Sequence, residues 1–178
     1  MEHVKMLDEH KTVMLLVNSQ LYNETILEIV QELSQKKVCY ISLNKTRDSL
    51  IDLFSKKGVN VNNIGFIDAI TKTIMDYPDE TENCTYISSP GALTELAIAI
   101  TKFLKLGFDY LIFDSLTNLL IYQKRAPIEK FMSNLINKIR NTETRAIFCA
   151  LGVQEQQLLL EQCGMFVDNV VDNSKMVK

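Results

Sequence analysis

The sequence predicts an α/β fold, a three-layer sandwich in which helices cover both faces of a mostly parallel central sheet. Apolar runs such as VMLLV, YLIF and AIFCAL are continuous rather than alternating, as expected for parallel strands buried on both faces. Helical patterns of about 10–15 residues separate these runs, which is the spacing of β-α-β crossovers. The 178 residues, 47% hydrophobic and 23% charged, fit one globular domain with a real core.

The first half of the chain is expected to contain three strands and two helices. Amphipathic patterns predict the helices, and β-branched apolar runs predict the strands. Gly58 follows the second helical pattern, where a glycine commonly ends a helix in the left-handed conformation. In chain order we expect a polar leader 1–11, strand 12–18, helix 24–36, strand 38–43, helix 46–57 and strand 64–68.

The second half is expected to continue the alternation after a polar loop that is the best candidate for a mobile segment. Ser89-Pro90-Gly91 forms a turn into a helix that Gly107 ends, and Pro127 opens another helix, as proline at the first helical position does. The expected elements are loop 71–83, strand 84–87, helix 91–106, strand 109–114, helix 127–140, strand 144–150, helix 153–163, strand 166–171 and a frayed tail 172–178.

Composition argues against several classes of protein. The net charge is −3 and the 19 basic residues are scattered, whereas nucleic-acid binding favours a basic face or stripe. No apolar stretch approaches the roughly 20 residues of a membrane helix. The charged N-terminus lacks a signal-peptide core, so a cytoplasmic location is expected. Neither the two histidines nor the four separated cysteines form a metal-binding spacing, so no metal site is expected.

Polar residues follow three of the expected strands at the carboxyl edge of the sheet, where ligands bind in open α/β folds. Residues 18–25, NSQLYNET, occupy the strand–loop–helix position of a phosphate-binding loop, whose pattern is G-x-x-x-x-G-K-[ST]. Asn44-Lys45 follows the second strand. Asp114-Ser115 ends a very apolar strand, and a buried carboxylate there needs a cation, a metal or several hydrogen-bond donors.

From Thr12 to about Asn173 the sequence resembles RecA/KaiC-type P-loop ATPases, a group that includes archaeal KaiC-like and RadA-like proteins. YLIFDSLTNLL is similar to the Walker B segment of that family, and VCYISLNKT is similar to its second strand. SPGALTELAIAITKFL and GMFVDNVVD extend the match. The resemblance implies a RecA-like P-loop NTPase core with an acidic Walker B residue that acts on Mg²⁺.

The same resemblance implies a degenerate Walker A motif. The two loop glycines fall at Asn18 and Asn23, and the lysine falls at Glu24. Asparagine tolerates left-handed backbone, so the shape of the loop is expected to survive. Glu24 instead places an anion beside the phosphates, which turns attraction into repulsion. A carboxylate at a helix N-terminus is itself favourable by about 0.3–1 kcal/mol, so Glu24 is expected to take the place of a phosphate.

Some other positions of the implied nucleotide site carry residues with the expected chemistry, and others do not. The acidic pair that activates water falls at Asn44 and Lys45. Thr25, at the Mg²⁺-binding position, and Asp114, at the Walker B position, keep the expected chemistry. The degenerate nucleotide-site positions are therefore Asn18, Asn23, Glu24, Thr25, Asn44, Lys45, Asp114 and Ser115.

A simpler interpretation of the octet remains open. NSQLYNET also reads as a plain β-α connection with Asn23 as the N-cap and Glu24 in the first turn. Asp114 then becomes a hydrogen-bonded structural carboxylate, which is the role we expect for it now. Lys45 and Arg47 are candidates to pair with Asp114 or Glu24, although such side chains are more often solvated. The order of elements, together with the Asp-Ser strand, favours a P-loop that has lost its chemistry.

The function expected from these residues is that of a pseudo-ATPase with no catalytic residue, cofactor or metal, acting as a protein-interaction or regulatory module. Its partner is expected to be another protein, either an active homologous ATPase or a second copy of itself, rather than nucleic acid or a membrane. The first alternative is a nucleotide-binding protein or weak ATPase that uses ATP with magnesium through a non-standard phosphate loop. The second is a DNA-recombination accessory.

Two segments are expected to form the contact surface. Loop 71–83 is long enough to be functional. Helix 127–140 carries Phe131, Leu135 and Ile139 at four-residue spacing. The competing interpretation packs this stripe on the sheet and leaves Lys130, Asn134 and Lys138 outside.

Overall fold

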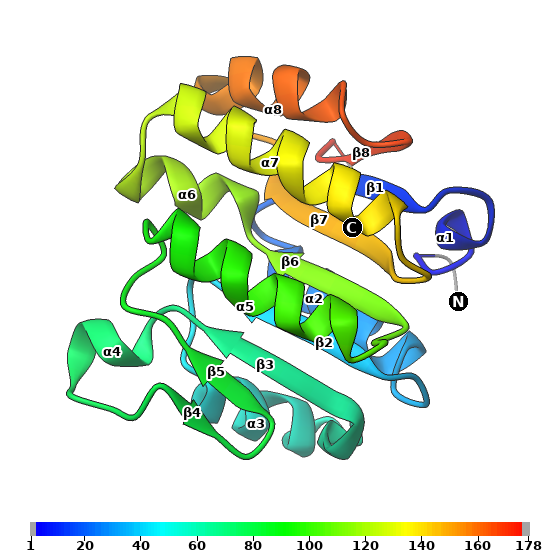
Figure 1. The fold of residues 1–178 in the computed structure, drawn as a ribbon. Helices are drawn as coiled ribbons and strands as arrows, with labels where there is room; N and C mark the ends of the chain where they lie inside the picture. The colour runs from blue at the N-terminus through cyan, green and yellow to red at the C-terminus, as the bar shows by residue number, and fades with distance from the viewer. Residues whose placement is uncertain (1–2, 176–178) are drawn as a thin grey trace.

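The structure is a computed structural model that describes residues 3–175, and its centre is one eight-stranded sheet (Figure 1). The strand order is β4-β5-β3-β2-β6-β7-β1-β8. Every pair from β5 to β8 in this order is parallel, and β4 pairs antiparallel with β5. The strands are β1 (Thr12–Val17), β2 (Val38–Ser42), β3 (Ile64–Asp68), β4 (Glu80–Thr81), β5 (Cys84–Tyr86), β6 (Tyr110–Asp114), β7 (Arg145–Leu151) and β8 (Asn169–Asn173).

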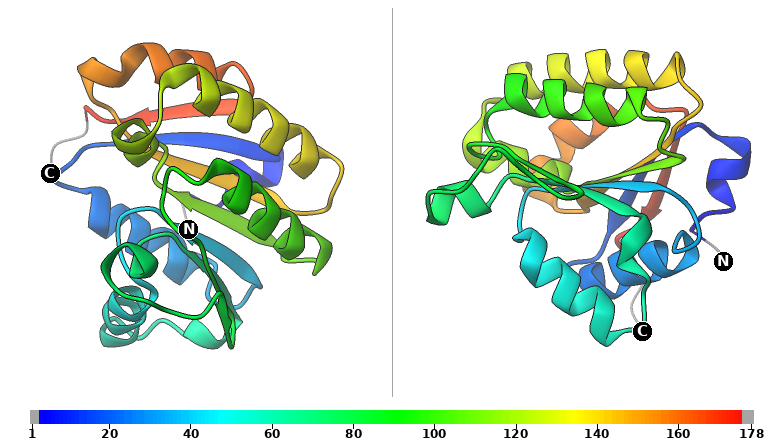
Figure 2. Two further views of the ribbon diagram at one scale, coloured as in Figure 1. Left: turned by 60° about the vertical axis from the view of Figure 1, so that its left-hand side comes forward. Right: turned by 60° about the horizontal axis from the view of Figure 1, so that its bottom comes forward.

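Helices cover both faces of the sheet, which makes three layers (Figure 2). One face packs against α5, α6, α7 and α8, and the other against α1, α2 and α3, so the sheet separates two apolar cores. The helices are α1 (Met6–Glu9), α2 (Tyr22–Glu32), α3 (Arg47–Lys56), α4 (Thr71–Ile74), α5 (Leu93–Lys105), α6 (Leu116–Tyr122), α7 (Arg125–Arg140) and α8 (Gln157–Gly164), with short 3-10 turns η1 (Val61–Asn63) and η2 (Gln154–Gln156). This arrangement confirms the α/β class.

All the strands and helices expected from the sequence are present, with shifted ends. Gly58 and Gly107 have φ of +75° and +70°, which confirms their role in ending helices. Pro127 lies in the first turn of α7 rather than at its first residue, because the helix begins at Arg125. Proline is tolerated there because the first four N–H groups of a helix have no intrahelical acceptor. Among the described residues, no helix is long and apolar enough to cross a membrane.

Four short helices and strands of the described residues were not expected, nor was the 3-10 turn η1. The polar leader contains α1, segment 71–83 contains α4 and β4, and α6 follows β6 directly. The expectation of a frayed tail from residue 172 is wrong for Asp172 and Asn173, which belong to β8 and pair with β1. The final three positions of that tail, 176–178, lie outside the described residues.

The apolar stripe of α7 packs inward, so the expectation that it forms a contact surface is wrong. Phe131, Leu135 and Ile139 are 8%, 4% and 0% exposed and belong to the core between α7 and the sheet. Lys130 and Lys138 lie on the outer side of the helix and are exposed. Burying the apolar stripe stabilises the helix against the sheet, as in an ordinary amphipathic helix.

Candidate functional site

Asp114 is the centre of the polar cluster at the carboxyl ends of the strands. It is the last residue of β6, between Ser42 of β2 and Cys149 of β7, and it is 1% exposed. The hydroxyl of Tyr22 donates to Oδ1 at 2.7 Å, and the amide of Asn44 donates to the same oxygen at 3.0 Å. The other oxygen, Oδ2, accepts a hydrogen bond from the hydroxyl of Tyr40. Three donors therefore compensate the burial of this carboxylate.

The two tyrosines reach Asp114 from different elements. Tyr22 lies in the first turn of α2, and Tyr40 lies in the middle of β2, and both are buried. Burial raises the pKa of each phenol well above its ordinary value, and the negative charge of Asp114 raises it further. Both hydroxyls therefore keep their protons and remain donors at physiological pH.

The NSQLYNET octet is folded more tightly than a phosphate-binding loop needs. Helix α2 begins at Tyr22, so only residues 18–21 connect β1 to the helix. Asn18 accepts a hydrogen bond from the Gln20 amide through Oδ1 at 2.8 Å, and the Leu21 amide donates to the Asn18 carbonyl at 3.1 Å. These two amides are satisfied within the turn, whereas a phosphate loop directs its amides at the ligand.

The structure corrects two expectations about this octet. Among the described residues, Asn83 is the non-glycine residue with positive φ, so neither Asn18 nor Asn23 is left-handed. The expectation that these asparagines preserve a left-handed loop is therefore wrong. Asn23 is not the N-cap either: that position is Leu21, and Asn23 already lies inside the helix. Glu24 is in the first turn of α2, as expected.

The remaining predicted site residues differ in whether they contact Asp114. Thr25 is buried within α2. Asn44 reaches Asp114 with its amide, while its Oδ1 is buried without a hydrogen-bond partner among the described residues. Lys45 extends toward α2 and donates to Asn23 Oδ1 at 3.0 Å. The structure thus brings Asn44 to Asp114 and Lys45 to Asn23.

Neither basic residue after β2 neutralises Asp114. Lys45 is bonded to Asn23, and Arg47 pairs with Asp48 at 3.3 Å on the surface. The candidate pairing of Lys45 or Arg47 with Asp114 is therefore not found, and this carboxylate accepts from hydroxyl and amide donors instead.

Ser115 follows Asp114 through a cis peptide bond and is 1% exposed. Its hydroxyl lies 2.8 Å from that of Thr117 and also contacts the side chain of Asn118. The Asn118 amide donates to the Ser115 carbonyl at 3.1 Å. These contacts hold the start of α6, which gives Ser115 a structural role at this edge of the sheet.

The sequence analysis missed a second buried carboxylate, Asp68, which ends β3 and is fully buried. Its Oδ2 accepts from the Arg47 amide at 2.7 Å and the Thr71 hydroxyl at 2.6 Å. Its Oδ1 accepts from the amides of Ile70 and Thr71, both at 2.8 Å. Asp68 thus fixes the starts of α3 and α4. The signal that could have identified it is the one that identified Asp114, an acidic residue at the end of an apolar strand.

No metal or reactive-thiol centre is found in the part of the chain that the structure describes. No group of three or more His, Cys, Asp or Glu side chains there is placed to hold a metal ion. The four cysteines are free and buried. Burial raises the pKa of the Cys84 and Cys163 thiols to about 12, so they behave as small apolar groups.

The fold of this chain is similar to that of a known protein. No protein-family model matches the sequence, and a search of curated proteins gave no match. Among solved structures, a KaiC-like protein from the hyperthermophilic archaeon Pyrococcus horikoshii OT3 superimposes with a TM-score of 0.65 at 12% sequence identity. The match covers 94% of this chain and 74% of the archaeal one. At this identity the likeness shows a shared KaiC/RecA-like fold and no more.

Proposed function

We propose that this chain is a RecA/KaiC-like pseudo-ATPase that acts by binding another protein, in a regulatory or assembly role. The observation that carries the proposal is the hydrogen bond between Tyr22 and Asp114. Tyr22 belongs to the octet that stands where a phosphate loop would be, and Asp114 stands where the Walker B residue would be. The chain's own side chains therefore join the two halves of the implied nucleotide site.

Binding of Mg²⁺-ATP in the usual pose is opposed by the hydrogen bonds of Asp114 and by charge. Asp114 would have to exchange its donors for the metal or its water, which would leave the buried Tyr22 and Tyr40 hydroxyls without their acceptor. A buried polar group left unpaired costs about 1–3 kcal/mol. In the first turn of α2, Glu24 adds a negative charge where phosphates would approach.

A binding role is supported by what the fold retains. Two complete apolar cores surround an intact sheet, so loss of the site chemistry has not been accompanied by loss of the domain. Large apolar side chains remain exposed on neighbouring segments, among them Ile74, Ile98 and Ile121 at 65%, 67% and 72%. Exposed apolar groups that cluster on one side of a domain mark protein-binding surfaces.

Calorimetry and thermal shift with ATP and MgCl₂ at millimolar concentration test the loss of nucleotide binding. We expect no saturable heat and no rise in the melting temperature. Ligand at about 100 times its Kd would stabilise the fold by about 2.7 kcal/mol, which thermal shift detects easily. A saturable shift that Asp114→Ala or Thr25→Ala abolishes would overturn the proposal in favour of a nucleotide-binding protein with a non-standard phosphate loop.

Affinity purification from the native cell, followed by size-exclusion chromatography, tests the binding role. We expect a specific protein to co-elute with the chain, or the chain to elute as a defined oligomer. Retention of DNA or RNA that is lost as salt is raised, with no protein partner, would instead favour a nucleic-acid accessory role.

A further inference from the structure

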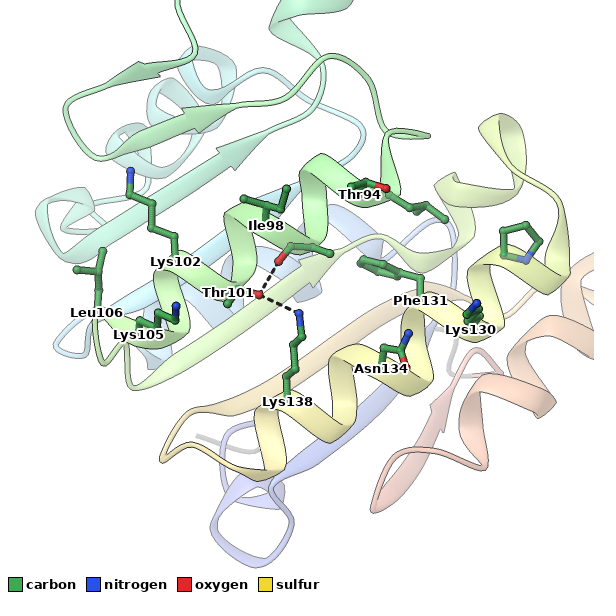
Figure 3. Close-up of a pocket in the computed structure, with 13 residues that line it drawn as sticks. Thr94, Ile98, Thr101, Lys102, Lys105, Leu106, Lys130, Phe131, Asn134 and Lys138 are labelled. Atoms are coloured by element: carbon green, nitrogen blue, oxygen red, sulfur yellow. Dashed lines mark hydrogen bonds between the residues drawn. The ribbon is translucent and has the colours of Figure 1, made fainter.

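A groove runs between α5 and α7 on the outer side of the helical layer (Figure 3). Its volume is about 800 Å³, and its lining includes Ala97, Ile98 and Leu106 together with part of Phe131. Ile98 and Leu106 are 67% and 60% exposed. The groove is therefore an open surface with apolar side chains that water contacts.

The charged residues of this groove all have the same sign. Its lining contains Lys102, Lys105, Lys130 and Lys138 and no acidic residue. Lys138 donates to the Thr101 hydroxyl at 3.1 Å, while Lys105 and Lys130 are exposed on opposite helices. In a chain whose net charge is −3, such a lysine cluster favours an acidic occupant that also carries apolar side chains.

The acidic segment 71–83, which contains α4 and β4, has the complementary composition. It carries Asp76, Asp79, Glu80 and Glu82 against one basic residue, Lys72. Ile74 and Met75, at its tip, are 65% and 54% exposed. In Figure 1 α4 projects from the body of the domain beyond the edge of the sheet. This segment offers the negative charge that the groove lacks, together with apolar side chains that match those of the groove.

We infer that the occupant of the groove is the acidic segment of a second copy of this chain, in a two-fold symmetric dimer. The inference rests on the proposed function, a domain that acts by binding protein, and names its partner. Groove and segment are neighbours in one copy, where Lys102 contacts Glu80 at 2.6 Å. Two adjacent, complementary surfaces on one side of a molecule form two identical contacts across a two-fold axis.

Charge favours this occupant of the groove over nucleic acid. A phosphate backbone laid along the lysines would also run beside the four acidic residues of segment 71–83, which repel it. Asp79 and Glu80 pair with Lys72 and Lys102 of the same copy. In the dimer the two other acidic residues, Asp76 and Glu82, face Lys105 and Lys130 of the other copy. The exposed Ile74 and Met75 then pack on Ile98 and Leu106 and add apolar burial, which a stable interface of about 1,200–2,000 Å² needs.

Two reciprocal variants test the dimer. The groove variant is Lys105→Glu with Lys130→Glu, and the segment variant is Asp76→Lys with Glu82→Lys. These four side chains are exposed, so the fold is expected to tolerate the changes, and circular dichroism checks it. Lys56→Glu with Lys57→Glu on α3 is the matched control, since these exposed lysines lie on the opposite face of the sheet.

Analytical ultracentrifugation at 5–200 μM protein, roughly the range in which weak dimers form, is the measurement. We expect the unmodified chain and the control to sediment at twice the 20.4-kDa mass, and each reciprocal variant alone to sediment as a monomer. Mixing the two variants is expected to restore the dimer, because every groove then faces a segment of opposite charge. Restoration on mixing separates a charge-matched interface from mere loss of solubility or folding.

The opposite results overturn the inference in distinguishable ways. If the unmodified chain is monomeric at 200 μM, roughly the upper limit for a weak dimer, or if mixing restores nothing, the second copy is not the occupant. The proposed function still stands if a cellular protein binds and the groove variant loses it. If the groove variant instead abolishes salt-sensitive binding of a DNA oligonucleotide, and no protein binds, the inference and the proposed function both fail.

Discussion

Asp68 and Asp114 end two strands of the same sheet and are both buried, yet different groups hold them. Asp68 receives its hydrogen bonds mainly from backbone amides, those of Arg47, Ile70 and Thr71. Asp114 receives its bonds from side chains, two phenols and one amide. A carboxylate that accepts from backbone amides fixes the course of the main chain. A side-chain donor, in contrast, can be removed by substitution of a single residue.

The difference separates a carboxylate that fixes the main chain from one that is held by side chains. A carboxylate that fixes the starts of two helices is part of the scaffold, and its loss disturbs the fold. Asp114, which the proposed function assigns to the Walker B position, instead accepts its hydrogen bonds from Tyr22, Tyr40 and Asn44. Substitution of these three donors therefore tests the proposed function more directly than substitution at Asp68 does.

The largest expected effect comes from Asp68→Ala, which tests whether Asp68 is essential for the stability of the fold. The change leaves three amide donors and the Thr71 hydroxyl without their acceptor, so we expect a loss of about 3–5 kcal/mol in the free energy of unfolding. Urea denaturation followed by circular dichroism measures it. Asp52→Ala, at an exposed position of α3, is the control and should change stability by no more than about 0.5 kcal/mol.

A loss below about 1 kcal/mol for Asp68→Ala would show that water or a shifted loop replaces the carboxylate. Asp68 would then no longer differ from a replaceable site, and the comparison would fail.

The next effect concerns the phenols that hold Asp114. Tyr22→Phe and Tyr40→Phe each remove one donor to a buried carboxylate, and we expect each to lower the free energy of unfolding by about 1.5–3 kcal/mol. Tyr110→Phe is the matched control, since its hydroxyl has no hydrogen-bond partner among the described residues. Equal losses of stability at all three positions would mean that the hydrogen bonds to Asp114 do not cause the loss.

Alkaline pH tests the contribution of the two phenols to stability without a substitution of the carboxylate. Burial, and then the charge of Asp114, raises the pKa of Tyr22 and Tyr40 above the unfolded value of 10.0, so the unfolded chain loses these protons first. Their contribution to stability is complete below pH 10 and is lost as pH rises above it. Urea midpoints measured from pH 8 to 11, a range that spans the usual tyrosine pKa of about 10, should fall less steeply in the double variant Tyr22→Phe with Tyr40→Phe.

The smallest expected effect concerns Asp168, a third carboxylate, at the opposite end of the strands. Burial raises its pKa, but hydrogen bonds from Thr12 and Arg140 outweigh burial, so the pKa lies below its ordinary value of 3.8. Its contribution is therefore present above about pH 4 and is lost as pH falls further. Asp168→Asn should lower stability at pH 7 by no more than about 1 kcal/mol. The variant and the unmodified chain should converge near pH 2, roughly two pH units below the usual aspartate pKa; persistence of the gap there would show that charge is not its cause.

The sheet was predictable from sequence because its strands are marked by local composition. Runs such as VMLLV and AIFCAL are short and apolar throughout, which is typical of strands buried on both faces. Helix α6 was missed because LTNLLIY is a short apolar run directly after a strand, where periodicity does not separate helix from strand. Elements of two to four residues, such as β4 and α4, are too short to show a period at all.

The candidate site was only half predictable. Asp114 was found because a carboxylate at the end of an apolar strand is conspicuous in the sequence, and the expectation of a hydrogen-bonded structural role agrees with the geometry. Tyr22 and Tyr40 were not found, because tyrosine is an ordinary residue in a helix or a strand. Their hydroxyls meet Asp114 only because β2 lies beside β6 and α2 packs across the same edge, which are consequences of tertiary structure.

The position of β1 has a consequence for the order in which the sheet is assembled. Both neighbours of β1 come from the far end of the chain, since Thr12 pairs with Ala146 and Val13 with Asn169. During synthesis β1 is made before either of its neighbours, whereas β2, β3, β5 and β6 can pair with one another before β7 and β8 are made. Contacts so distant in sequence slow folding and leave a strand edge unprotected until β7 and β8 emerge. The nascent chain is thus most exposed to aggregation and to chaperones just before β7 and β8 are made, a window set by the strand order rather than by any single side chain.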